Sequence, residues 1–283
     1  MSTLYISDLD GTLLGPDARL SDETVTTLNR LLDAGMLFTV ATSRTPATVI
    51  DLLSRLHLRL PAVLMAGTLL YDIPTRRALA ITCFPDEVAA SVCRALQNED
   101  KEALLYVVRG EKMFVYYREL TGEFERTFVA ERRHSPYKTF SQTQNYAQSI
   151  LGGQLMRALL CLEDEADARR WFSIFGAMPG VLCYLYPNEY GAGFTVEAYP
   201  DGCDKATGLA AVRSLCGARR VVAFGDNLND LPLFAASDES CAVGNAVPAV
   251  RKNASCVIGS NADSGVARWL ARHAGGEGAL AAD

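Results

Sequence analysis

The feature that most constrains this chain is a pair of carboxylates, Asp8 and Asp10, directly after its first apolar run. That run, residues 4–6, has the pattern of a short buried strand, and Gly11 lets the chain turn sharply behind the carboxylates. Alternate residues of an extended segment point the same way, so both carboxylates are expected to face one cleft. Beside a bound cation both can stay ionised, one as a nucleophile and the other as a proton shuttle. An acidic turn after a strand is the simpler alternative for this segment alone.

The composition indicates a folded, acidic protein. Its 283 residues suffice for one large domain or two ordinary ones, and 49% hydrophobic residues can fill a sizeable core. The net charge is −6 and no segment concentrates lysine and arginine, which argues against nucleic acid as a partner. With no signal peptide and no apolar run near the roughly 20 residues that span a bilayer, we expect a cytoplasmic protein without a membrane partner. The eight cysteines form no Cys-x-x-Cys pair and are expected to be reduced, and no obligate protein partner is evident.

Strand and helix patterns alternate in the first part of the chain. Strand-like runs lie at residues 4–6, 36–41 and 61–65, and Ser21 and Thr45-Pro46 are good helix starts between them. This order predicts an α/β fold with a doubly wound, mainly parallel sheet and helices on both faces.

The pattern changes at about residue 82 and returns after residue 190. The segments in between are a hairpin pattern at 104–117, an apolar run at 155–162, a helix at 163–175 and a strand at 181–186. Locally paired strands with intervening helices predict an inserted α+β domain. The resulting division is a discontinuous core of residues 1–81 and 191–273, an insertion of residues 82–190 and a flexible tail of residues 274–283.

Three further segments carry polar groups where parallel sheets place their chemistry. Thr42 follows the second strand, and Lys205 begins a helix, which is the less favourable end for a cation and hints at an anionic partner. Residues 225–230, with the sequence Gly-Asp-Asn-Leu-Asn-Asp, directly follow an apolar strand. Their carboxylates and amides offer hard oxygen ligands that suit Mg²⁺, although an Asx-rich helix cap also accounts for Asp230.

Together these elements resemble the haloacid dehalogenase-type (HAD) phosphatase superfamily, whose four motifs appear in order as residues 8–12, Thr42, Lys205 and residues 225–230. The insertion resembles the cap of the Cof-like branch, subfamily IIB, and residues 242–246 and 261–267 resemble its closing segments. The resemblance implies a Rossmann-like core with an inserted α+β cap. Two positions depart from the branch: Ser43 stands where glycine is usual, and Ala66 precedes Gly67 where Asn-Gly is usual.

The resemblance also implies a phosphatase that hydrolyses small phosphomonoesters, such as sugar phosphates or phosphorylated cofactors. Asp8 would attack phosphorus to form an aspartyl-phosphate, and Asp10 would protonate the leaving alcohol and then deprotonate water. Mg²⁺ would be held by the Asp8 carboxylate, the Asp10 backbone carbonyl and Asp226. A phosphosugar mutase and a non-catalytic phospho-ligand sensor on the same fold are the alternatives.

The remaining roles are less sharply defined. Thr42, Ser43 and Lys205 would bind the transferring phosphate, and Asn229 would contact either the phosphate or Lys205. Asp230 would lie near the metal without ligating it directly, and Arg44 would form a salt bridge near the site or face the cap. The cap would select the small phosphorylated substrate, with candidates, each also explicable as an ordinary strand or hairpin residue, at Tyr184, Tyr186, Asn188, Glu189 and Tyr190.

Overall fold

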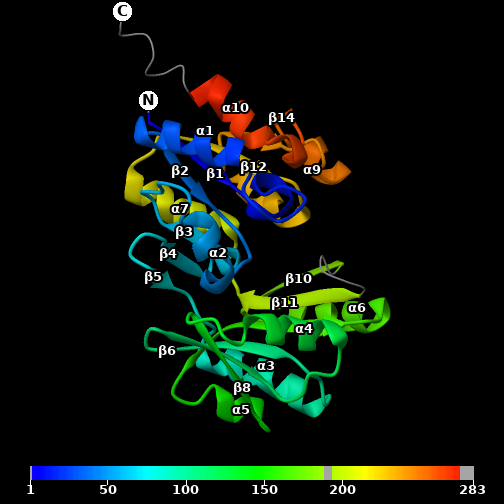
Figure 1. The fold of residues 1–283 in the computed structure, drawn as a ribbon. Helices are drawn as coiled ribbons and strands as arrows, with labels where there is room; N and C mark the ends of the chain where they lie inside the picture. Colours follow the sequence, from blue (N-terminus) through cyan, green and yellow to red (C-terminus); the bar gives the residue numbers. More distant parts are fainter. Residues whose placement is uncertain (1, 188–192, 275–283) are drawn as a thin grey trace, which may run out of the picture. The chain divides into compact units, whose positions relative to one another are not determined.

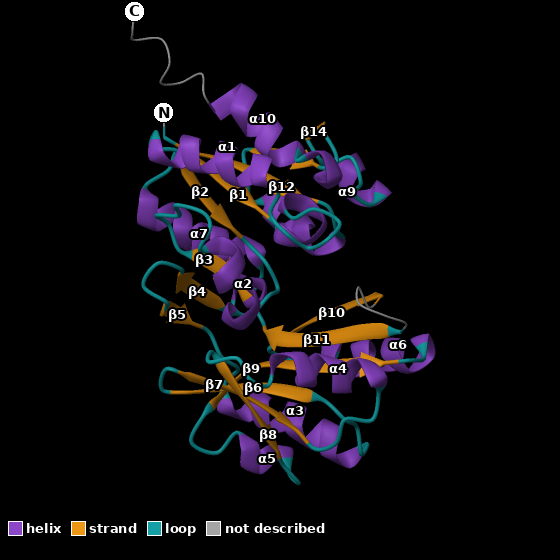
Figure 2. Ribbon diagram, viewed as in Figure 1, coloured by secondary structure: helices purple, strands orange, loops and turns teal. Residues whose placement is uncertain are grey.

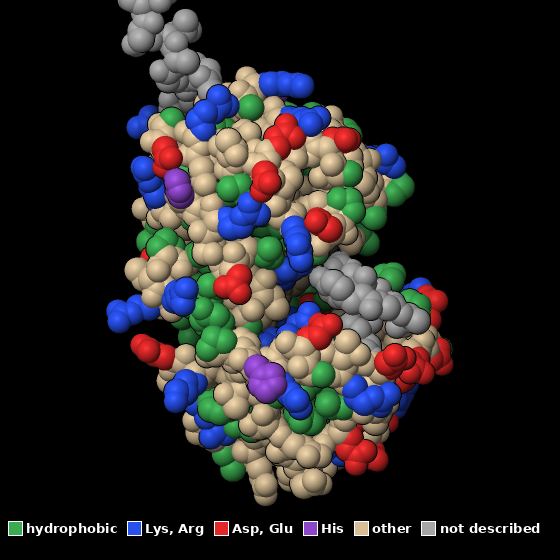
Figure 3. All heavy atoms as spheres, in the orientation of Figure 1, with side chains coloured by type: hydrophobic (Ala, Val, Ile, Leu, Met, Phe, Trp, Pro, Cys, Tyr) green, Lys and Arg blue, Asp and Glu red, His purple; other side chains and the backbone are tan. Residues whose placement is uncertain are grey.

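The computed structural model describes residues 2–187 and 193–274, and the chain divides into two compact units (Figure 1). The first unit combines Met1–Ile81 with Asp204–Asp283, and the second is Thr82–Cys203. Within the described residues, none of the helices combines the length and apolarity that a membrane crossing requires. On the face of the described residues in Figure 3, basic and acidic side chains are interspersed.

The first unit is built on a five-stranded parallel sheet in the order β14-β13-β12-β1-β2 (Figure 2). Its strands are β1 (Thr3–Ser7), β2 (Leu37–Val40), β12 (Arg220–Gly225), β13 (Glu239–Ala242) and β14 (Cys256–Val257). A single parallel bridge from Ala41 to Val63 leads on to an antiparallel sheet of β3 (Ala62–Leu64), β4 (Leu69–Asp72) and β5 (Arg77–Ile81). Since the chain leaves β1 toward β2 on one side and returns to it through β12 on the other, the carboxyl end of β1 is a switch point where α/β sheets bind ligands. The predicted α/β class with a mainly parallel sheet is confirmed.

The helices of the first unit are α1 (Asp22–Asp33), α2 (Pro46–Leu53), α7 (Lys205–Cys216), α8 (Leu231–Ala235), α9 (Pro248–Asn253) and α10 (Gly265–His273). The first three begin where the sequence predicts a helix, after Ser21, at Pro46 and at Lys205. Ser21 caps α1, its Oγ accepting the backbone N–H of Thr24 at 3.0 Å. Helix α10 packs along α1 and places Trp269 against the rings of Tyr5 and Phe224, which fixes it over the central strands.

A left-handed stretch after β3 supports the second motif. Met65, Ala66 and Gly67 have φ angles of 50°, 54° and 105°. Only glycine fits at position 67, because an added Cβ would lie 2.0 Å from the carbonyl oxygen of Asp204. The N–H groups of Met65 and Ala66 donate to the backbone carbonyls of Arg44 and Thr42, each at 3.0 Å. The strained loop therefore holds the backbone of residues 42–44 in place through these two hydrogen bonds.

The second unit is a six-stranded sheet in the order β10-β11-β9-β6-β7-β8, antiparallel except for the parallel pair β7–β8. Its strands are β6 (Leu104–Arg109), β7 (Lys112–Tyr117), β8 (Lys138–Gln142), β9 (Gln154–Leu162), β10 (Val181–Pro187) and β11 (Phe194–Pro200). Its helices are α3 (Asp86–Asn98), α4 (Glu123–Arg132), α5 (Tyr146–Ser149) and α6 (Glu165–Gly176). The hairpin that residues 104–117 predict is present as β6–β7.

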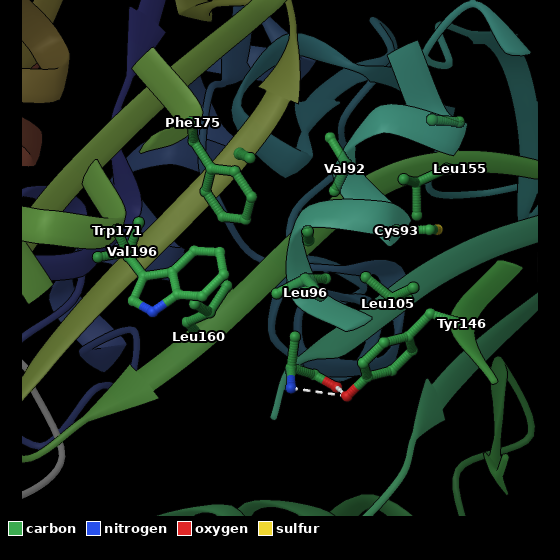
Figure 4. Close-up of a cluster of buried hydrophobic side chains, with 14 of the residues drawn as sticks. Val92, Cys93, Leu96, Leu105, Tyr146, Leu155, Leu160, Trp171, Phe175 and Val196 are labelled. Carbon is green, nitrogen blue, oxygen red and sulfur yellow. Dashed lines mark hydrogen bonds between the residues drawn. The ribbon is translucent and has the colours of Figure 1, made fainter. Parts of the chain in front are cut away.

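One face of this second sheet carries the hydrophobic core of the unit (Figure 4). Trp171 and Phe175 of α6 and Val92 and Leu96 of α3 pack there on alternate strand residues such as Leu105, Leu155, Leu160 and Val196. The Tyr146 hydroxyl is satisfied within this core, accepting the N–H of Ala103 at 2.8 Å and donating to its carbonyl at 3.0 Å. The intervening strand residues point to the opposite face, which is described further below.

The predicted return to the first unit at residue 191 is wrong. Strand β11 was expected to resume the doubly wound pattern, but it lies between β9 and β10 and pairs antiparallel with both. The second unit therefore extends to Cys203, and the first resumes at Asp204. The periodicity of residues 194–198 indicates a strand but not the sheet to which the strand belongs. For this reason the sequence pattern led to its assignment to the wrong unit. The expected tail lies, apart from Ala274, outside the described residues.

Replacing Ala66 with glycine is expected to raise the free energy of unfolding by about 0.5–1 kcal/mol, because glycine adopts the left-handed conformation without the Cβ penalty. Urea denaturation in the absence of ligands measures this change. Ala62→Gly, in the adjacent strand β3 where no positive φ is required, is the matched control and should be destabilising. A loss of stability in both variants would contradict strain at Ala66.

Candidate active site

Two acidic loops of the first unit meet at the carboxyl ends of neighbouring strands. Asp8 follows β1 and Asp226 follows β12, and the two strands pair in parallel register up to Ser7 and Phe224. The backbone N–H of Asp8 donates to the carbonyl of Phe224 at 3.0 Å, so the pairing continues into the motif itself. The sheet thus brings together side chains that are more than 200 residues apart in sequence.

Lys205, the first residue of α7, joins both loops through a buried ion triad. Its Nζ lies 2.7 Å from Asp8 Oδ1 and 2.6 Å from Asp230 Oδ1, and the lysine is 2% exposed. Burial by itself lowers the pKa of Lys205, but the attraction of Asp230 and Asp8 outweighs it, and the pKa is raised. The ammonium therefore stays charged and fixes one oxygen of Asp8.

Asp230 stabilises the loop of residues 225–230 through hydrogen bonds to its backbone. Its Oδ2 accepts the backbone N–H groups of Asp226 at 2.9 Å and Asn227 at 3.0 Å, while Oδ1 accepts Lys205. Gly225 makes room for this carboxylate, because an added Cβ would lie 2.6 Å from the Cβ of Asp230. With both oxygens occupied by donors, Asp230 shapes the loop that presents Asp226.

Asp226 is held against the first motif. Thr12 Oγ1 donates to Asp226 Oδ1 at 2.7 Å, and a Cβ on Gly11 would lie 2.4 Å from Asp226 Oδ2. Glycine at position 11, with φ of 72°, is thus required by both the turn and the close approach. Burial raises the pKa of Asp226 to about 6; the Thr12 hydrogen bond opposes this shift, and Asp230 adds to it.

The carboxylates of Asp8 and Asp226 fit a divalent cation, and Asp230 lies close to them. Oxygens of Asp8, Asp226 and Asp230 lie within 4.8 Å of one another. Burial raises the pKa of Asp8 well above its ordinary value; Lys205 opposes this, and the neighbouring carboxylates add to it. In the described part of the chain, no donor reaches Asp8 Oδ2 or Asp226 Oδ2, so each carboxylate keeps one hard oxygen for a metal.

Arg44 forms a salt bridge at the site, which is one of its two predicted alternatives. Its Nε and a terminal nitrogen donate to the two oxygens of Asp10 at 2.7 and 2.6 Å. The pair is largely buried, with side-chain exposures of 16% for Arg44 and 23% for Asp10. A bidentate, charge-assisted pair of this kind fixes the orientation of the carboxylate as well as its position.

The other predicted phosphate ligands lie beside these groups or along the same loops. Thr42 is 1% exposed, and its Oγ1 accepts the backbone N–H of Arg44 at 3.2 Å; half-buried Ser43 lies between them. The Oδ1 of Asn229 is buried and has no hydrogen-bond partner in the described chain. No hydrogen bond joins Asn229 to Lys205 in the described residues, where the ammonium donates to Asp8 and Asp230.

Three residues that sequence reasoning gave no role hold the first motif in place. Besides Thr12, Asn245 donates from Nδ2 to the Gly11 carbonyl at 2.8 Å, and its Oδ1 accepts the Asn261 N–H at 3.0 Å. Asn261 in turn donates from Nδ2 to the Leu14 carbonyl at 2.9 Å. Both asparagines lie in the closing segments at 242–246 and 261–267. The sequence therefore indicated these segments, but it did not indicate which groups the asparagines would contact.

The predicted substrate-selecting residues lie on the second unit or outside the described residues. Tyr184 and Tyr186 are on β10, and Tyr184 packs edge-on against Tyr199 with 6.2 Å between ring centroids. Asn188, Glu189 and Tyr190 lie outside the described residues.

Comparison with known proteins identifies the family. Residues 5–270 match the model of the haloacid dehalogenase-like hydrolases, so the chain belongs to this family. A structure of a haloacid dehalogenase-like hydrolase from Bacteroides thetaiotaomicron is similar with a TM-score of 0.76 at 20% identity, covering 96% of this chain and 99% of that one. That likeness supports the fold.

Relatives with names for their activity are similar over most of their length. The pyridoxal phosphate phosphatase YbhA of Escherichia coli strain K12 is 28% identical over 279 residues, 96% of this chain and 99% of the relative. An HMP-PP phosphatase of Enterobacter sp. strain 638 is 27% identical over 251 residues, 88% of this chain and 86% of the relative. Both relatives are phosphatases by name.

Lys205→Met is expected to lower the free energy of unfolding by about 3–5 kcal/mol in the presence of chelator, because it leaves Asp8 and Asp230 buried without their cation. Urea denaturation of the metal-free protein measures the loss. Lys252→Met, at an exposed position of α9, is the control and should change stability by less than about 0.5 kcal/mol. Equal small effects in both variants would show that the triad contributes little to stability.

Proposed function

We propose that this protein is a Mg²⁺-dependent phosphatase that hydrolyses small phosphomonoesters through an aspartyl-phosphate on Asp8. The observation that carries the proposal is the Asp8 carboxylate, with one oxygen held by Lys205 and the other without a donor in the described chain, close to Asp10, Asp226 and a switch point of the sheet. Membership of the haloacid dehalogenase-like hydrolases supports the reaction class.

Asp8 is the proposed nucleophile. Its Oδ2 attacks phosphorus as the bond to the leaving oxygen breaks, and water later cleaves the aspartyl-phosphate. Lys205 favours the ionised form of Asp8 and aligns the carboxylate through Oδ1, and the backbone bond to Phe224 fixes its Cα. Asp8, Asp226 and the backbone carbonyl of Asp10 would hold Mg²⁺, whose positive charge would offset the repulsion between the nucleophile and the phosphate dianion.

Asp10 is the proposed general acid and base. It gives a proton to the leaving alcohol in the first half of the reaction and takes one from water in the second. Arg44 is a positioning residue, because it acts on the reaction through the two oxygens of Asp10. Holding that carboxylate in one orientation keeps it within reach of the leaving oxygen and of the attacking water.

The phosphoryl oxygens are proposed to bind the polar groups beside these carboxylates. Thr42, Ser43 and Lys205 supply donors, and the unpartnered side-chain amide of Asn229 supplies another through its Nδ2 group. Because these groups are fixed by the loop after β3 and by α7, they need little rearrangement when negative charge spreads over the phosphoryl group.

The substrate class is proposed from the relatives together with the site. The Escherichia coli relative is named for pyridoxal phosphate and the Enterobacter relative for HMP-PP. We therefore expect a small phosphorylated metabolite, such as a phosphorylated cofactor or a sugar phosphate. The second unit, Thr82–Cys203, is the proposed selector of the leaving group.

Asp8→Asn is expected to reduce turnover by a factor on the order of 10³ or more, because the amide lacks the charge to attack phosphorus. Phosphate release from a panel of phosphomonoesters with Mg²⁺ measures this loss. Asp51→Asn, at an exposed position of α2, is the matched control and should keep the parent rate. Appreciable turnover by Asp8→Asn would exclude Asp8 as the nucleophile. Isomerised products without phosphate release would indicate a mutase, and binding without turnover a sensor.

Mg²⁺ affinity is expected to fall as the pH drops from 7.5 to 5. The pKa of Asp226 is raised to about 6, so below that pH most molecules carry a proton that the metal must displace, and above it the carboxylate is ionised. Calorimetric titration in two buffers of different ionisation enthalpy measures both the affinity and the protons released. An affinity independent of pH would contradict Asp226 as a ligand, and activity that survives exhaustive chelation would contradict the metal itself.

A further inference from the structure

The second unit contains a buried lysine that no described residue satisfies. Lys138, at the start of β8, is 3% exposed, and its Nζ makes no hydrogen bond within the described chain. A buried ammonium carries three donors, and leaving them unpaired away from water is strongly unfavourable. Burial, followed by the repulsion of Arg157 and Arg132, lowers the pKa of Lys138 to about 7. A residue needed only to fill this space would be leucine or methionine.

Aromatic rings surround the ammonium without supplying acceptors for its protons. The Nζ lies 5.2 Å from the ring centroid of Phe128, 5.3 Å from that of Phe140 and 5.7 Å from that of Tyr106. Cation–π attraction stabilises a desolvated ammonium. The rings therefore help to tolerate the charge, but its three N–H donors still require an oxygen partner.

A second buried cation contacts the same tyrosine ring. The guanidinium of Arg157, on β9, lies 4.0 Å from the centroid of Tyr106, which is opposite Arg157 in the register of β6 and β9. Arg157 is 5% exposed and forms a salt bridge of 3.0 Å with Glu197 on β11. Tyr106, Arg157, Glu197 and Lys138 thus form a polar cluster on the sheet face opposite the hydrophobic core.

The acidic groups near this cluster are already engaged. Glu197 pairs with Arg157 and accepts the Tyr199 hydroxyl at 3.0 Å. Glu125 Oε2 accepts the N–H groups of Thr121 and Gly122 at the start of α4. Arg132, at the end of α4, pairs with Glu131. In the described residues, Lys138 therefore forms no ion pair with any of these carboxylates.

We infer that Lys138 binds an oxyanion, a carboxylate or phosphate group of a small metabolite, within the polar cluster of the second unit. The anion supplies the acceptors that the rings lack and places an opposite charge beside the Lys138 ammonium. Its source is either the leaving portion of the substrate or a separate effector molecule. The first of these rests on the proposed function and narrows it to phosphomonoesters with a second anionic group.

A binding measurement tests the site independently of turnover. Thermal unfolding of the full chain is followed in chelator with and without glycerate, which carries a carboxylate and no phosphoryl group. The parent is expected to gain several degrees in Tm at saturating glycerate, and Lys138→Met to gain none. Lys112→Met, on β7 and exposed, is the matched control and should respond like the parent. Equal gains in the parent and Lys138→Met, or none in either, would overturn the inference.

The sign of the stability change separates anion binding from a purely structural role. Without glycerate, Lys138→Met is expected to raise Tm, since it removes an unsatisfied buried charge and keeps the side-chain volume. A lysine that only stabilises the fold through its rings, or one solvated by internal water, would make the same variant less stable. Lys138→Gln retains a polar group without the charge, so it provides a second folded variant for the binding measurement.

Kinetics with two matched substrates identify the source of the anion. Glycerol 3-phosphate and 3-phosphoglycerate differ in that the second carries a carboxylate on its leaving portion. If that carboxylate binds Lys138, Lys138→Met loses roughly tenfold or more in kcat/KM on 3-phosphoglycerate and less than about twofold on glycerol 3-phosphate. Glycerate-dependent stabilisation with equal kinetic effects on both substrates points to a separate effector. If the parent turns over neither substrate, the proposed function loses support, while the binding result still decides the site.

Discussion

The structure of the site depends on one buried ammonium. Lys205 lies between Asp8 and Asp230, buried carboxylates that would otherwise repel each other. Because the lysine begins α7, the Asp8 carboxylate follows β1 and the Asp230 carboxylate braces the loop after β12, three separate elements are tied at one point. The ion pairs that allow these charges to be buried also occupy Oδ1 of Asp8. Oδ2 is left without a hydrogen-bond donor in the described residues.

Glycine residues, which have no side chain, are as important for this geometry as the charged residues. Gly11, Gly225 and Gly67 each lie where a Cβ would overlap a carboxylate, another side chain or the backbone of a neighbouring motif. The motifs can approach to hydrogen-bonding distance only because these positions carry no side chain. Ala66 shows the opposite compromise, since it adopts a left-handed conformation in spite of its Cβ while its N–H supports Thr42. Backbone strain next to the site is thus offset by the hydrogen bonds that it permits.

The sequence patterns predicted the features that depend on local residue order. They also predicted those that follow from the rule that the carboxyl ends of parallel strands lie at the same edge of a sheet. The runs at 4–6 and 220–224 and the acidic turns behind them required only periodicity and that rule. Strand β11 was assigned to the wrong unit, because alternation does not specify which strands will be its neighbours. Strand β8 was missed because its sequence, Lys-Thr-Phe-Ser-Gln, lacks an apolar run. The partner of Arg44 stayed open because a long, flexible side chain can reach several groups from one Cα.

The interrupted first unit has a consequence for the order in which the chain can fold during synthesis. Strand β1 leaves the ribosome early, but its partner β12 and the residues that meet Asp8 follow about 200 positions later. The second unit is a continuous segment, Thr82–Cys203, and all its strands are available before α7 exists. It can therefore complete its own core first and shorten the loop that β1 and β12 must close. Asp8 gains its surroundings only when nearly the whole chain has been made.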